Sequence, residues 1–151
     1  MRMRSGYIFW LWGVAVIMTG FLPGSSRAGK YRLEINIRQL RNDKGNIILY
    51  LYNRPGTIPD KHFNKYYKKA VIPAGKNATT VFFDLPYGEY AVNAIHDENG
   101  NGKIDKGFLL PVEGLGFTNF ETISLRNRPD FIKAKFLLQK DSAVTIRMIY
   151  L

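Results

Sequence analysis

The segment YRLEINIR, residues 31–38, alternates apolar and polar side chains along its whole length. In an extended chain, one face therefore carries Tyr31, Leu33, Ile35 and Ile37, and the other carries Arg32, Glu34, Asn36 and Arg38. This period of two predicts a half-buried antiparallel strand. The next segment, NIILYLYN at residues 46–53, is apolar on both faces and predicts a central strand. We expect it to pair with residues 31–38 as a hairpin.

The period-two pattern recurs toward the C-terminus, at Val81, Phe83 and Leu85, at Ile132, Ala134, Phe136 and Leu138, and at Val144, Ile146, Met148 and Tyr150. The turn LPYG, residues 85–88, is expected to join one of these strands to a partner strand at residues 89–97. Residues 60–70 are the exception and predict a short helix capped by Asp60. About seven strands predict an all-β fold, a single antiparallel β-sandwich of two sheets.

The first residues form a separate segment. A basic start is followed by the apolar run GYIFWLWGVAVIMTGFL, residues 6–22, and then by PGSSRAG with small residues at Ser26 and Ala28. This order predicts a signal peptide over residues 1–28, cleaved after Ala28, and a single domain over residues 29–151 that is periplasmic or extracellular. The alternative is an uncleaved segment that anchors the protein in a membrane.

Composition excludes several kinds of chemistry. The chain has no cysteine, so a disulfide framework, thiol catalysis and thiolate metal sites are excluded. Removing residues 1–28 lowers the formal charge from +10 to +7, because Arg2, Arg4 and Arg27 are lost. Basic residues are scattered except in KHFNKYYKK, residues 61–69. We expect no nucleic-acid partner, and one alternative function is a basic surface that binds acidic polysaccharide or lipid.

The loop HDENGNGKID, residues 96–105, carries the chemistry of a metal site. Oxygen-bearing side chains stand at positions 1, 3, 5 and 9 of a calcium-loop pattern, which are Asp97, Asn99, Asn101 and Asp105. Gly102 occupies the sharp bend, and the carbonyl of Lys103 is the backbone ligand. Phe108 stands where a bidentate Glu is usual, so Glu113 is the candidate to supply the missing carboxylate. The alternative is a metal-free turn held by Asp and Asn side chains.

A catalytic site finds less support. Adjacent residues of a strand point to opposite faces, so His96 and Asp97 are not expected to act together. No Ser, His and Asp arrangement with a nucleophile elbow is present, and we predict no catalytic residues. The alternative is a small envelope hydrolase or isomerase that uses His96 with Asp105 or Glu113.

Three stretches, FFDLPYGEYAVNAIHDENGNGKID, GFLLPVEGLGFTN and RPDFIKAKFLL, together resemble the secreted bacterial proteins of domain-of-unknown-function family 2141. The resemblance implies an exported protein with a transthyretin-like or immunoglobulin-like sandwich, and it implies no activity. DLPYGEY is also similar to the turn of carboxypeptidase regulatory-like modules. The positions that match the family pattern are His96, Asp97, Asn99, Asn101, Asp105, Pro111, Glu113, Gly114, Gly116 and Phe117.

The leading hypothesis is therefore a secreted, non-enzymatic β-sandwich module of the bacterial cell envelope. Its loop at residues 97–105 binds calcium, or closes on itself by hydrogen bonds, and so rigidifies a surface that meets an envelope protein or polysaccharide.

Overall fold

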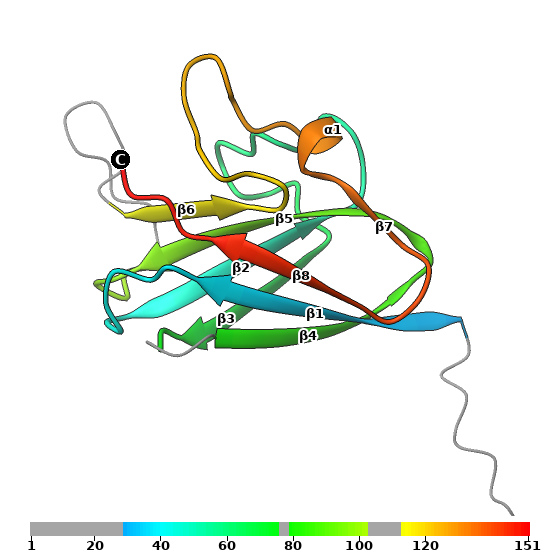
Figure 1. Ribbon diagram of the computed structural model, residues 1–151, viewed down its shortest axis with the longest axis horizontal. Coiled ribbons are helices and arrows are strands. Elements are labelled where there is room, and N and C mark those ends of the chain that lie inside the picture. Colours follow the sequence, from blue (N-terminus) through cyan, green and yellow to red (C-terminus); the bar gives the residue numbers. More distant parts are fainter. Residues whose placement is uncertain (1–28, 76–78, 103–112) are drawn as a thin grey trace, which may run out of the picture.

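Two β-sheets pack face to face in the part of the chain that the computed structural model describes, residues 29–75, 79–102 and 113–151 (Figure 1). One sheet has the order β4-β1-β8, formed by Thr79–Pro86, Lys30–Arg38 and Ser142–Arg147. The other has the order β3-β2-β5-β6, formed by Lys68–Pro73, Asn46–Tyr52, Gly88–Asp97 and Gly114–Phe117, and β7 (Phe136–Leu138) pairs with the start of β5. The prediction of an all-β sandwich is confirmed.

The alternation in β1 places its apolar face in the core between the sheets. Leu33, Ile35 and Ile37 are fully buried there, while the intervening polar residues lie on the outer face. Ile146 of β8 is buried in the same core. The pairing of β1 with β8 is parallel, and every other strand pair described is antiparallel, so the predicted antiparallel sandwich contains one parallel pair.

The predicted hairpins are wrong. Strand β1 pairs with β4 and β8, whereas β2 pairs with β3 and β5, so residues 39–45 cross from one sheet to the other. The turn LPYG likewise leads from β4 in one sheet to β5 in the other. The physical reason is that β2 and β5 are apolar on both faces and therefore occupy the middle of a sheet that is covered on both sides.

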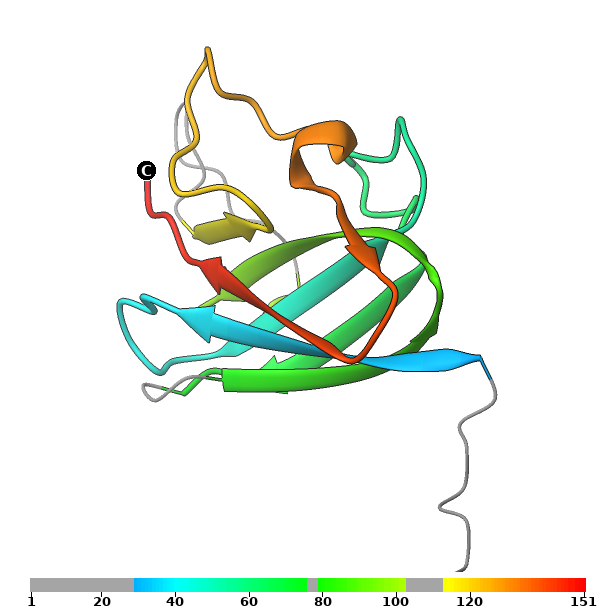
Figure 2. The same ribbon diagram turned by 45° about the vertical axis from the view of Figure 1, so that its right-hand side comes forward.

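A third layer of loops and one helix covers the outer face of the larger sheet (Figure 2). Phe131 and Ala134 of the helix α1 (Phe131–Ala134) are buried there in one apolar cluster with Ile48 of β2 and Ile95 of β5. Residues 131–134 were expected in a strand, but the Asp130 carboxylate accepts a hydrogen bond from the Lys133 N–H at 2.9 Å and caps a helical turn.

The helix predicted over residues 60–70 is absent from this described segment, which forms turns and then enters β3 at Lys68. Asp60 caps no helix. Its buried carboxylate instead accepts the backbone N–H of Lys65 at 2.8 Å, which holds a loop rather than a first helical turn.

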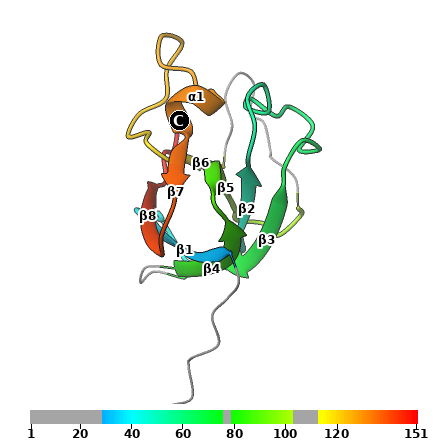
Figure 3. The same ribbon diagram turned by 90° about the vertical axis from the view of Figure 1, so that its right-hand side faces the viewer.

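The end of the chain joins the two sheets, along the path from β8 past β6 in Figure 1. Figure 3 views the same sandwich from the side on which β7 lies in front. After β8, the Met148 N–H donates to the Arg38 carbonyl of β1, and Ile149 then exchanges two backbone hydrogen bonds with Leu115 of β6. The C-terminal residues therefore close one end of the sandwich. Within the described residues, no helix has the length and hydropathy needed to span a membrane. The predicted signal peptide, residues 1–28, lies outside the described residues.

Candidate functional site

The segment His96-Asp97-Glu98 ends β5 at the closed end of the sandwich. The loop between β1 and β2 approaches this segment very closely at Gly45. An ideal Cβ on Gly45, which has φ +66°, would lie 2.0 Å from the Asp97 carbonyl oxygen. Only glycine permits this approach. On the other side, an added Cβ at Gly114 of β6 would lie 2.5 Å from the ring of Tyr150. Two glycines therefore let three chain segments close around His96 and Glu98.

His96 is fully buried, and both of its ring nitrogens bond to distant segments. Its Nε2 lies 2.9 Å from the Lys44 carbonyl oxygen and its Nδ1 lies 2.8 Å from the Tyr150 hydroxyl. A carbonyl oxygen only accepts, so Nε2 is the donor to Lys44, and Nδ1 of a neutral ring accepts the Tyr150 hydroxyl proton. The hydroxyl oxygen in turn accepts the Arg41 N–H at 3.1 Å. This arrangement favours a structural role for His96 over the catalytic alternative.

Glu98 links the same end of the molecule to the loop between β1 and β2. Its carboxylate accepts hydrogen bonds from Arg41 Nε at 2.5 Å and Asn42 Nδ2 at 3.0 Å, and it lies 3.7 Å from His96 Nδ1. Burial by itself raises the pKa of Glu98, but the hydrogen bonds from Arg41 and Asn42 and the charge of Arg41 lower it below its usual value. The Arg41 guanidinium also lies 4.7 Å from the centre of the Tyr150 ring.

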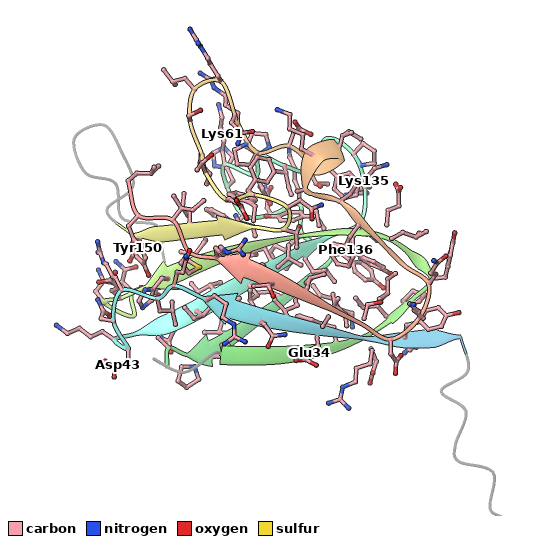
Figure 4. All side chains as sticks on the ribbon, viewed as in Figure 1. Glu34, Asp43, Lys61, Lys135, Phe136 and Tyr150 are labelled. Atoms are coloured by element: carbon pink, nitrogen blue, oxygen red, sulfur yellow. The ribbon has the colours of Figure 1, made fainter. Side chains whose placement is uncertain are left out.

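We call these groups, His96, Glu98, Arg41, Tyr150 and the Lys44 carbonyl, the end clamp. Sequence reasoning missed Arg41, Lys44 and Tyr150 as members, because each lies more than fifty positions from its partner, His96 or Glu98, and belongs to no local motif. Figure 4 shows Tyr150 at the end of the sandwich where the chain terminates. The signal that could have pointed toward them is the place of His96 in an apolar strand, because a histidine buried there needs a partner for each ring nitrogen.

Asp97 closes the loop that follows β5. Its carboxylate oxygens accept the backbone N–H of Asn101 at 3.1 Å and of Gly102 at 2.8 Å, and Asn99 Oδ1 also accepts from Asn101. Gly100 and Gly102 both have positive φ, which the winding of the loop requires. The structure therefore brings together Asp97, Asn99 and Asn101 in a side-chain-capped turn. A carboxylate oxygen that accepts one N–H keeps a second lone pair for another donor or a cation.

The remaining predicted ligands are placed differently. Glu113 is buried and directly precedes Gly114, where an added Cβ would lie 2.5 Å from the Tyr150 ring, so Glu113 adjoins the end clamp. Lys103, Asp105, Phe108 and Pro111 lie outside the described residues. Within the described residues, no group of three or more His, Asp and Glu side chains is arranged to hold a metal ion.

Fold and site together define a β-sandwich module whose end is held by hydrogen bonds that join β5, the loop between β1 and β2, and the C-terminal residues. The family model described as "Uncharacterized protein conserved in bacteria (DUF2141)" matches residues 35–147, and the chain belongs to this family. The resemblance stated from the sequence is therefore confirmed. No curated protein and no solved structure matches the chain.

Proposed function

We propose that this protein is an exported, non-enzymatic β-sandwich module of the bacterial cell envelope, in which the end clamp is a structural lock. The observation that carries the proposal is the state of His96, whose ring is fully buried with both nitrogens bonded to other segments. A general base needs a nitrogen within reach of a substrate proton. The clamp instead holds three chain segments in one arrangement, which suits a module that presents a rigid surface.

The export part of this proposal rests on the apolar run at residues 6–22 and the small residues at Ser26 and Ala28. It is tested by expressing the full chain in a Gram-negative bacterium, separating periplasm from cytoplasm, and sequencing the N-terminus of the product. We expect a periplasmic protein that begins at Gly29. A product that keeps residues 1–28 and stays in the cytoplasm would overturn the proposal.

A second candidate function is calcium binding by the loop after β5, which would stabilise that loop. The supporting observations are the ligand spacing of residues 97–105 and the wound turn in which Asp97 already accepts two N–H groups. At ten times its dissociation constant, one bound ion adds about 1.4 kcal/mol, which raises the melting temperature by several degrees. Glu113 and Asp105 are the carboxylates to test next.

Thermal unfolding followed by far-UV circular dichroism, in excess EDTA and in millimolar calcium, tests this candidate. We expect calcium to raise the melting temperature of the wild type and of Asp43→Ala, which removes an exposed carboxylate of a neighbouring loop, but not that of Asp97→Ala. Equal melts in EDTA and calcium would leave the turn as a hydrogen-bonded structure only. The module proposal would survive that result, because the end clamp does not depend on the ion.

A further inference from the structure

The segment that leads into β3, together with the start of β3, exposes four lysines, and residues 54–70 contain no exposed acid. Lys61, Lys65, Lys68 and Lys69 are all exposed, and no ion pair joins them to a carboxylate within residues 29–75, 79–102 and 113–151. Figure 4 shows Lys61 among the loops that cover the larger sheet, on the side away from Glu34. We call these lysines, together with Tyr66 and Tyr67, the basic surface.

Asp60 explains why this surface is positive throughout. It is the sole acid of residues 54–70, and its side chain is turned inward, with 7% of the residue exposed. Its Oδ2 accepts the Lys65 N–H at 2.8 Å and lies 3.4 Å from the Tyr52 hydroxyl. Burial, and then the charge of Asp60, raise the pKa of Tyr52. The carboxylate therefore orders the loop from inside and is not exposed among the four lysines.

Aromatic rings lie close to the two lysines of β3. Tyr50 of β2 stacks on Phe63 with ring centres 4.8 Å apart, Tyr66 packs at 5.2 Å, and Lys69 Nζ lies 5.3 Å above the Tyr50 ring. Tyr66 and Tyr67 remain 39% and 44% exposed. The register of β3 on β2 places Lys69 opposite Tyr50. Lys69 therefore shares a face of this edge strand with Tyr50, whereas Lys68 points to the opposite face and lies 6.0 Å from the centre of the Tyr67 ring.

We propose that the basic surface binds an acidic polysaccharide of the envelope. The inference rests on the proposed function, because export is what brings the surface to such a polymer. Lysine ammonium groups pair with carboxylate or sulfate groups, and exposed tyrosine rings offer an apolar face and a hydroxyl to a sugar ring. A lipid surface is disfavoured, since no Leu, Ile or Trp is exposed in residues 61–69 to enter a bilayer.

The test measures binding of the purified protein to alginate, heparin, uncharged dextran and vesicles of phosphatidylglycerol and phosphatidylcholine, at several salt concentrations. The patch variant carries Lys65→Gln, Lys68→Gln and Lys69→Gln. The matched control carries Lys30→Gln, Arg126→Gln and Lys140→Gln, which removes the same charge from other exposed positions. Thermal unfolding of each variant, followed by circular dichroism, confirms that the variant folds. Tyr67→Ser tests the ring contribution without a change of charge.

We expect the wild type and the control to bind alginate or heparin with an affinity that falls steeply with salt, and not to bind dextran. The patch variant should bind about tenfold more weakly, and Tyr67→Ser several-fold more weakly at every salt concentration. Equal affinities of the patch variant and the control would overturn the proposal, as would binding to the vesicles alone. If the protein is exported but does not bind the acidic polymers, the polysaccharide proposal is overturned and the proposed function stands. If the protein binds them but is not exported, the proposed function is rejected instead.

Discussion

The Tyr150 hydroxyl lies 2.8 Å from Nδ1 of His96, although the two residues are 54 positions apart in the chain. The contact ties the last residues, which follow β8, to the end of β5 in the other sheet. It is completed by the Arg41 N–H, which donates to the same hydroxyl. One phenol oxygen therefore joins three chain segments at this end of the sandwich.

Tyr150→Phe removes that oxygen and is expected to lower the free energy of unfolding by about 1–3 kcal/mol, because Nδ1 of the buried His96 loses its donor. Urea unfolding followed by circular dichroism measures the change. Tyr87→Phe is the control, since Tyr87 is 64% exposed and its hydroxyl should contribute little. Matching midpoints for the two variants would show that the end clamp does not stabilise the fold.

Gly45→Ala and Gly56→Ala separate a steric clash from backbone strain. Both glycines have positive φ, but an added Cβ meets the Asp97 backbone only at Gly45, and nothing lies within 4 Å at Gly56. The Gly56 variant should lose about 1–2 kcal/mol from strain alone, and the Gly45 variant should lose distinctly more. Denaturant midpoints of the two variants provide the comparison. Similar losses would mean that the loop between β1 and β2 can withdraw from β5 at little cost.

The lowered pKa of Glu98 predicts that the protein loses stability as the pH falls. The unfolded state binds the proton at a higher pH than the folded state does, so this contribution to stability is complete above the unfolded value of 4.5. It is lost as the pH falls from there through the folded value. Urea midpoints between about pH 3 and pH 7 should therefore fall less in Glu98→Gln than in the wild type. Parallel profiles for the two proteins would refute the prediction.

Helix α1 gives a test of the layer that covers the larger sheet. Phe131 is buried against that sheet, whereas its neighbour Ile132 is 59% exposed. Phe131→Ala should cost about 3–5 kcal/mol, and Ile132→Ala should change stability by less than about 0.5 kcal/mol. Thermal melts distinguish this from a strand, in which Ile132 and Ala134 would share the buried face and the Ile132 variant would be the damaging one.

The candidate site was predictable only where its parts are neighbours in the chain. Asp97, Asn99 and Gly102 lie within six positions, and their spacing indicated a wound loop that the structure contains. Arg41 bonds to Glu98, and Tyr150 bonds to His96, from segments that are distant in the chain. No local sequence pattern predicts a hydrogen bond across such a separation. The short helix at Phe131–Ala134 was missed because one turn held by the Asp130 cap carries no helical period.

Alternation of apolar and polar residues determined from the sequence alone that β1 is half-buried, and the continuous apolar run determined that β2 is covered on both faces. These are properties of each strand by itself, because side-chain direction repeats every two residues. Which strands pair was decided only by the tertiary structure. A strand that needs burial on both faces gains more from the middle of the larger sheet than from pairing with its neighbour in sequence. The chain therefore crosses between sheets at residues 39–45, and the same crossing brings Arg41 and Lys44 to the end of β5.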